Sequence, residues 1–290
     1  MTTKREVVNG ANAPFQSKPL SPVIGAEITG LDLSSPLPPE IISALRTAWL
    51  EHQLLLFRAQ DLTEEQQIRF AEKFGSPVGG RNKNKISARR DQDPRIMLIT
   101  NIRKEGKTIG SLPDGELQFH SDSAFLDCPL MGTLLYGVEL PSTGGNTLFA
   151  NTYLAYDALS PAQKKALASL EAINVYDYAT QVRTGRLDRA QSPHATHPVI
   201  RTHPETGRKG IYVNRLMTEE IVDFPTEQGD PLLAELFDLI ERRDFMYEHV
   251  WQKGDLLMWD NRCTQHARTD FPENETRLLR RVGLEGDKPW

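Results

Sequence analysis

The sequence predicts a mainly β fold with inserted helices, an α+β domain whose core is a β-sandwich or barrel. Two observations support this fold class. The chain contains many short strand-like apolar runs, and these do not alternate regularly with helices as they do in parallel βαβ sheets. A length of 290 residues allows one large domain or two small ones. No repeat or linker-like segment divides the chain, so we expect a polar arm at residues 1–21 and a single domain at residues 22–290.

Four segments have the sequence pattern of helices. Residues 38–52 (PPEIISALRTAWLEH) open with prolines and place apolar residues along one face. Residues 62–75 have Thr63 as an N-cap, acidic residues in the first turn and a glycine at the end. A third helix is expected to begin at Ser160-Pro161, with the serine as its N-cap, and a fourth covers residues 230–245.

Strands are expected between these helices, because apolar or alternating runs are bounded there by glycine, proline and polar residues. They comprise a hairpin within 23–33, strands at 54–58, 96–102, 131–140 and 148–150, a strand–turn–strand unit at 197–214, two strands around Gly254-Asp255, and a last strand from residue 277 onward. Residues 76–95 form a long polar loop, and a loop of this length in a compact domain is our candidate for a lid over a site.

The composition argues against several classes of function. The 34 Lys and Arg residues are nearly balanced by 39 Asp and Glu residues and form no basic block, so a nucleic-acid partner is not expected. No run approaches the roughly 18 apolar residues of a membrane span, and the first 15 residues lack the apolar segment of a secretory signal. Only two cysteines occur, Cys128 and Cys263, and the simplest expectation is a reduced protein of the cytoplasm.

The stretch GELQFHSDSAF, residues 115–125, contains a possible metal-binding pair. Apolar and polar residues alternate in it, which predicts a strand, and on a strand His120 and Asp122 point to the same face. At about 3.3 Å per residue they lie roughly 6–7 Å apart along the strand. Such a pair is either a solvated strand face or two-thirds of a metal site, and the spacing alone does not choose between them.

A third candidate ligand is His266, in the segment GDLLMWDNRCTQHARTDF, which is followed by an arginine-rich strand. Arg277 and Arg281 are four residues apart and share one face of that strand, whereas Arg280 faces the other side. Two inward-facing arginines are costly to bury without anionic partners. The sequence offers no acidic pair at matching spacing on a neighbouring strand, so a bound anion is expected to take that role.

Two histidines and one carboxylate can serve two kinds of chemistry. With the remaining coordination positions open, they form the facial triad of non-heme Fe(II) oxygenases, where a co-substrate and dioxygen occupy the free side. The same ligand types hold zinc in hydrolases. The three residues by themselves leave a zinc-dependent hydrolase as the alternative.

The order of several segments resembles the TauD/TfdA family of Fe(II)- and 2-oxoglutarate-dependent dioxygenases, which includes taurine dioxygenase and the phenoxyacetate herbicide dioxygenases. The segments are HSDSAF, ELPSTGGNTLFAN, HPVIRTHPETGRKGIYVN, GDLLMWDNRCTQHA, RLLRRV and the terminal GDKPW. The resemblance runs from about residue 22 to the C-terminus. It implies a double-stranded β-helix (jelly roll, cupin-like) as the core fold, and Fe(II), 2-oxoglutarate and O2 as cofactor and co-substrates.

The resemblance also implies roles for single residues. His120, Asp122 and His266 stand where the family's catalytic iron ligands stand. Thr147 and Arg277 match the residues that bind the distal carboxylate of 2-oxoglutarate, for which a planar bidentate guanidinium is suited. Three further positions are expected to contact substrate: Arg281, which matches the arginine that holds the acidic group of taurine, and Gln118 and Phe119 beside the first histidine.

The sequence departs from the taurine enzyme in ways that bear on the substrate. Phe119 replaces a tryptophan, and residues 76–90 contain no histidine where that enzyme has a substrate contact. The expected function is therefore hydroxylation of a C–H bond in a small, anionic substrate, a sulfonate or carboxylate, with succinate and CO2 as co-products. The hydroxylated product can fragment if its carbon bears a heteroatom. As in the family, a homo-oligomer (dimer or tetramer) is expected.

Overall fold

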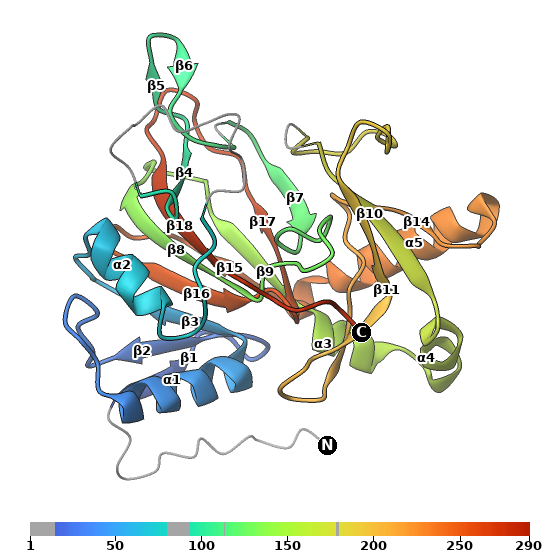
Figure 1. The fold of residues 1–290 in the computed structure, drawn as a ribbon, viewed down its shortest axis with the longest axis horizontal. Helices are drawn as coiled ribbons and strands as arrows, with labels where there is room; N and C mark the ends of the chain where they lie inside the picture. Colours follow the sequence, from blue (N-terminus) through green and yellow to red (C-terminus); the bar gives the residue numbers. More distant parts are fainter. Residues whose placement is uncertain (1–14, 80–92, 113, 178–179) are drawn as a thin grey trace.

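The computed structural model describes residues 15–79, 93–112, 114–177 and 180–290. Its centre consists of a seven-stranded and a four-stranded sheet, with helices on their outer faces (Figure 1). A mainly β fold with inserted helices is thereby confirmed. Every helix in the described ranges is too short or too polar to cross a lipid bilayer.

The larger sheet is antiparallel except for one parallel pair, β2–β3. Its strands, in spatial order, are β1 (Gln16–Pro19), β2 (Ala26–Thr29), β3 (Leu54–Phe57), β16 (Leu256–Asp260), β8 (Gly132–Glu139), β18 (Leu278–Leu284) and β4 (Met97–Thr100). Helices α1 (Pro39–His52) and α2 (Glu64–Ala71) cover one face, where Trp49 and Phe70 join the buried apolar core. This face carries no candidate site residue.

The smaller sheet contains β15 (Met246–His249), β9 (Thr147–Asn151), β17 (Thr264–Arg268) and β7 (Leu117–His120), in this order. One of its faces packs against the larger sheet, because Phe149 and Tyr247 join Leu257 and Trp259 in one apolar cluster. Consecutive strands often lie in different sheets: β7, β9, β15 and β17 belong to the smaller one, and β8, β16 and β18 to the larger one. The space between the sheets is therefore lined by residues from both.

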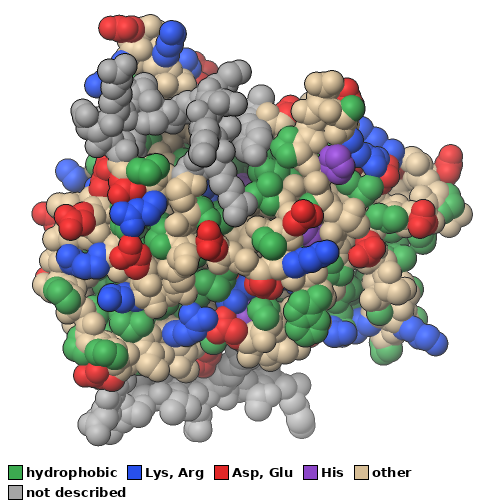
Figure 2. Space-filling model, in the orientation of Figure 1, with side chains coloured by type: hydrophobic (Ala, Val, Ile, Leu, Met, Phe, Trp, Pro, Cys, Tyr) green, Lys and Arg blue, Asp and Glu red, His purple; other side chains and the backbone are tan. Residues whose placement is uncertain are grey.

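The other face of the smaller sheet packs against a second layer. Its helices are α3 (Thr152–Ala158), α4 (Pro161–Leu167), α5 (Thr226–Ile240) and the 3-10 helix Arg243–Phe245. Its strands form a three-stranded sheet of β10 (Glu171–Val175), β11 (His194–Pro198) and β14 (Thr218–Ile221), and a pair of β12 (Ile200–Thr202) and β13 (Lys209–Ile211). A separate hairpin joins β5 (Arg103–Lys104) and β6 (Lys107–Thr108). On the face in Figure 2, positive and negative side chains are interspersed over most of the described surface.

Local sequence signals for the helices are mostly confirmed. Thr63 and Ser160 each form a capping box with a glutamine three residues later, at the starts of α2 and α4. Helix α5 begins four residues before the expected residue 230 and ends at Ile240, five residues before the expected end. It includes Pro231 as its sixth residue, so the helix lacks the hydrogen bond that an N–H at this position would donate to the carbonyl of Glu227.

Two expectations near the N-terminus are wrong. Residues 23–33 do not form a hairpin, because β2 pairs with the earlier strand β1 and with the later strand β3. The expected arm at residues 1–21 is also too long, since β1 belongs to the larger sheet; residues 1–14 lie outside the described part of the chain. Most of the expected lid loop, residues 80–92, lies outside it as well.

Candidate active site

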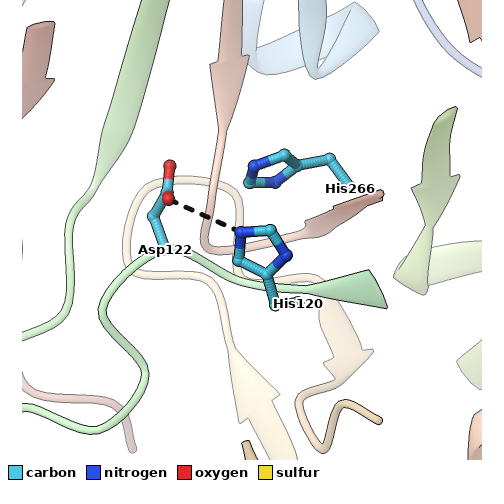
Figure 3. Close-up of side chains that lie close together, drawn as sticks. All are labelled: His120, Asp122 and His266. Atoms are coloured by element: carbon cyan, nitrogen blue, oxygen red, sulfur yellow. Dashed lines mark ion pairs between the residues drawn. The ribbon is translucent and has the colours of Figure 1, made fainter. Parts of the chain in front are cut away.

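The two candidate histidines are brought together by strand pairing. His120 on β7 is the register partner of His266 on β17, and their ring centroids are 4.1 Å apart. Both side chains are buried, at 5% and 9% exposure. Figure 3 shows the two imidazoles side by side, and the carboxylate of Asp122 on the same side of them.

Asp122 does not lie on the strand, in contrast to the sequence expectation. Strand β7 ends at His120, and the chain turns at residues 122–125, where Ser123 has a positive φ of 61°. The turn places the Asp122 carboxylate beside His120, with 3.9 Å between Oδ1 and Nε2. One ligand atom from each of the three residues lies within 4.8 Å of the others, so all three can contact one metal ion.

The hydrogen bonds of the histidines leave nitrogen atoms free for a metal. Nδ1 of His120 lies 2.9 Å from the carbonyl oxygen of Gln118 and donates to it, so Nε2 carries the lone pair. Nδ1 of His266 is buried and has no hydrogen-bond partner among the described residues. Burial holds the pKa of both imidazoles below the ordinary value, and for His266 the neighbouring His120 adds to this effect. The neutral form, which binds metals, is favoured.

Asp122 is held in its ionised form by its surroundings. Thr133 donates to Oδ2 at 2.5 Å, and Nη2 of Arg281 lies 2.8 Å from Oδ1. Burial raises the pKa of Asp122, but Arg281 and the two histidines lower it more, so it lies well below the ordinary value. Arg281 therefore has an acidic partner within the protein, whereas we expected a bound anion to take that role. The strand pattern did not predict Asp122 as the partner of Arg281, because Asp122 comes from a turn and not from a neighbouring strand.

Arg277 is buried without a carboxylate. Its side chain donates to the carbonyl of Gly145 from Nε and Nη2, at 3.2 and 3.0 Å, and no described acidic group lies within ion-pair distance. A Cβ on Gly145 would lie 2.8 Å from Nε, so a glycine is needed for this approach. Burial lowers the pKa of Arg277 to about 9, and the nearby Arg268 contributes to this. An unneutralised guanidinium at this depth favours an anionic ligand.

Thr147 lies one row of the smaller sheet away from the metal ligands. Phe149, His266 and His120 are register partners in one row, and Thr147 and Arg268 are partners two residues further along. At about 3.3 Å per residue the rows are roughly 6–7 Å apart. A ligand that chelates a metal at the histidines and carries a carboxylate at its other end would extend toward Thr147 and Arg277.

Arg268 lies beside the candidate site, as the register partner of Thr147, and was not identified from the sequence. It is 6% exposed and donates to the carbonyls of Leu112, Asp114 and Gly115 and to the side chain of Gln181, with N···O distances of 2.6–3.0 Å. It anchors the loop that leads into β7. The alternation of residues 266 and 268 along one strand was the signal that could have found it.

The two remaining expected substrate contacts are placed elsewhere. Phe119 faces the opposite side of the smaller sheet from His120 and packs in the apolar cluster with Ala150 and Ala267. Adjacent residues of a strand point to opposite faces, so the Phe119 side chain lies away from His120, which does not favour the substrate contact expected there. The side chain of Gln118 accepts a hydrogen bond from the backbone N–H of Arg183 at 2.7 Å, and its own carbonyl orients His120. Its observed contacts are structural.

A second cluster of ligand-type side chains has a different character. His203, Asp260 and Cys263 also lie within 4.8 Å of one another. However, Asp260 accepts two hydrogen bonds from the guanidinium of Arg262, at 2.9 and 2.7 Å, and one from His203 at 3.0 Å. Because Arg262 neutralises the carboxylate of Asp260, we interpret this cluster as a structural ion-pair network and not as a metal site.

The chain matches the model of a known protein family, "Taurine catabolism dioxygenase TauD, TfdA family", over residues 16–282. It is 32% identical to an alkylsulfatase of Acinetobacter baylyi, with 94% of this chain and 86% of the relative covered. It is 31% identical to an alpha-ketoglutarate-dependent 2,4-dichlorophenoxyacetate dioxygenase of Cupriavidus pinatubonensis, with 92% and 96% covered. A crystal structure described as a putative alpha-ketoglutarate-dependent taurine dioxygenase from Burkholderia xenovorans superposes with a TM-score of 0.81 at 30% identity, with 95% and 94% covered.

Proposed function

We propose that this chain, which belongs to the TauD/TfdA family of Fe(II)- and 2-oxoglutarate-dependent dioxygenases, hydroxylates a C–H bond of a small anionic substrate. Succinate and CO2 would be the co-products. The observation that carries the proposal is the combination of His120, Asp122 and His266 with a buried, unneutralised Arg277 beside the next row of the sheet.

The residues of the site fit the iron and the co-substrate. His120, Asp122 and His266 would hold Fe(II) through two neutral imidazoles and a carboxylate, the ligand set that leaves positions open. Fe(II) bound there supplies the oxidising chemistry of O2 and 2-oxoglutarate. Arg277 would bind the distal carboxylate of 2-oxoglutarate, and Thr147 would donate a hydrogen bond to it. The burial of these groups excludes water from the reacting atoms.

Arg281 is the proposed contact for the acidic group of the substrate. Its side chain is 17% exposed, and its Nη1 lies 3.5 Å from the sulfur of Met97, an exposed residue at the edge of the larger sheet. Because Arg281 pairs with Asp122, a substrate anion bound to Arg281 would lie next to the proposed metal ligands. The alkylsulfatase and the dichlorophenoxyacetate dioxygenase are named for substrates that carry an anionic group. A hydroxylated carbon that bears an oxygen in such a substrate would fragment.

The finer features of the protein remain proposals. The two facing sheets and the passage of successive strands between them support a double-stranded β-helix core. A single domain from β1 onward agrees with the extent of the family match. A homo-oligomer and a location in the cytoplasm are predictions from the sequence.

The decisive experiment separates the dioxygenase from the alternative zinc-dependent hydrolase. Fe(II)-loaded protein should consume O2 and form succinate from 2-oxoglutarate, and small organic anions should stimulate this. Asp122→Ala should lose bound iron and succinate formation together, whereas Asp244→Ala, at an exposed aspartate, should retain both. Hydrolytic activity with Zn(II) and no succinate with Fe(II) would replace the proposal by the alternative.

A further inference from the structure

We propose that Trp251 is a positioning residue for the co-substrate. Its indole N–H binds the hydroxyl oxygen of Thr147, and the hydroxyl proton is thereby left to donate to the distal carboxylate of 2-oxoglutarate. This inference rests on the proposed function, because it needs a carboxylate beside Thr147. It assigns a role to a residue that lies outside the metal ligands and the arginines.

The contact between the two side chains is well defined. Nε1 of Trp251 lies 3.0 Å from Oγ1 of Thr147, and both residues are buried, at 9% and 3% exposure. An indole N–H can only donate a hydrogen bond, so the threonine oxygen accepts in this pair. The proton of the hydroxyl must then be directed to a different acceptor. A hydroxyl held in this way acts as a donor toward an anion, without first having to reorient.

The direction of Thr147 agrees with this role. It lies two residues before Phe149 on β9, so both side chains point into the space between the sheets, where Phe149 lies beside His266. Trp251 and the Gly144-Gly145 turn line one cavity of about 180 Å³. The carbonyl of Gly145 is the acceptor for Arg277. Trp251 is therefore adjacent to the turn that holds the proposed carboxylate-binding arginine.

The indole is itself held by a buried polar network. The ring of His249 lies perpendicular to that of Trp251, with centroids 4.8 Å apart. Nε2 of His249 donates to Asp255 at 3.0 Å, and Tyr247 lies 3.1 Å from Nδ1. Asp255 is paired with Arg58 at 2.7 Å. Two partners fix the histidine ring, and the histidine restricts the tryptophan, so the direction of the indole N–H is set before any ligand arrives.

The test uses Zn(II)-loaded protein, because zinc has no redox chemistry and 2-oxoglutarate is not consumed. Calorimetric titration would compare 2-oxoglutarate with 2-oxobutyrate, which keeps the chelating keto acid but lacks the distal carboxylate. Trp251→Phe should weaken 2-oxoglutarate binding about fivefold to tenfold, the worth of one modest hydrogen bond. Binding of 2-oxobutyrate should not change. The control Trp290→Phe, at an exposed tryptophan, should leave both affinities unchanged.

A double-mutant cycle identifies the route of the effect. In a Thr147→Val background the hydroxyl is absent, and Trp251→Phe should then have no further effect on 2-oxoglutarate binding. Additive losses would mean that Trp251 acts by packing alone and would overturn the inference, as would equal weakening of both ligands or no effect. Wild-type protein that binds 2-oxoglutarate no more tightly than 2-oxobutyrate would instead contradict the proposed function.

A measurement on the wild-type chain covers the case in which Trp251→Phe does not fold. The four tryptophans give four indole N–H signals in NMR spectra of the Zn(II)-loaded protein. The signal that Thr147→Val shifts belongs to Trp251. This signal should move when 2-oxoglutarate is added and stay in place with 2-oxobutyrate. A Trp251 signal that does not respond to 2-oxoglutarate would overturn the inference.

Discussion

Arg277 differs from two other deeply buried arginines in its lack of a counter-ion. Arg262 pairs with Asp260 and Arg201 pairs with Asp287, whereas the Arg277 guanidinium bonds to the carbonyl of Gly145 and lies over the ring of Phe271, with no carboxylate partner among the described residues. A carbonyl satisfies the N–H groups but does not neutralise the charge. The free energy of leaving this charge unneutralised would be offset when a carboxylate binds.

Replacement of Arg277 tests this directly. Arg277→Gln removes a bidentate, charged donor, and we expect the KM for 2-oxoglutarate to rise about tenfold to 100-fold, with a smaller change in the KM for substrate. The control is Arg280→Gln on the same strand, whose side chain bonds to the Leu62 carbonyl and lies over Tyr136. The reverse pattern, with substrate affected more than 2-oxoglutarate, would mean that Arg277 and Arg281 have exchanged roles.

In its proposed role, Arg281 makes the enzyme prefer anionic substrates over neutral ones. Arg281→Gln should raise the KM for anionic substrates by roughly tenfold, because a charge-assisted hydrogen bond is lost, while neutral esters of the same acids are unaffected. Since Arg281 also pairs with Asp122, the iron content of the same samples should be measured. An identical response of charged and neutral substrates would argue that the arginine acts only through Asp122.

At the scale of elements, the connection between β16 and β17 is held by the ion pair around Asp260. This aspartate is fully buried, ends β16, and binds both Arg262 and His203. Arg262 in turn contacts Glu205 at 2.7 Å. The network thus ties the turn before His266 to the segment between β12 and β13. His266, one of the two proposed histidine ligands, follows this turn and depends on it for its position.

Breaking this network should destabilise the fold. Asp260→Asn leaves the buried Arg262 with the partly exposed Glu205 as its remaining carboxylate partner, and we expect the free energy of unfolding to fall by up to about 3–5 kcal/mol. The control Asp244→Asn breaks an exposed pair with Arg242 and should leave the free energy of unfolding nearly unchanged, because solvent screens this pair. Urea unfolding of the metal-free variants measures both. If both substitutions lower the free energy of unfolding equally, the buried pair stabilises the fold no more than the exposed pair does.

At the scale of the whole molecule, buried histidines make stability depend on pH. Burial lowers the pKa of His197, partly offset by carbonyl partners, and that of His249, partly offset by Asp255. A histidine with a lowered pKa in the folded state binds fewer protons there than in the unfolded chain. Its contribution to stability is therefore complete above about pH 6.5, the ordinary value, and is lost as the pH falls below it.

We accordingly expect metal-free protein to have a lower urea midpoint at pH 5.5 than at pH 7.5. Removal of metal excludes the separate effect of protons that compete for the ligands. His197→Asn should make the pH dependence shallower, because one of the titrating groups is gone. A midpoint that is unchanged or higher at pH 5.5 would contradict this assignment of neutral buried histidines.

Several features of the protein were determined by the sequence alone. The capped helices α2 and α4 were predicted from Thr63 and Ser160, because a cap and its partner lie within one turn of each other. The three metal-ligand candidates could be named because their residue types are specific to metal chemistry. Both kinds of signal are contained in a few neighbouring residues or in the order of short motifs.

Other features were decided only by the tertiary structure. Asp122 reaches the site from a turn, Arg281 pairs with it, Phe119 faces the far side of the sheet, and Trp251 binds Thr147. Each of these depends on where a strand ends or on the register between segments distant in the sequence. If the register of a strand shifts by one residue, each of its side chains moves to the opposite face of the sheet. The register and the strand ends are determined when the two sheets pack and bury their apolar faces against each other. The local sequence alone does not determine them.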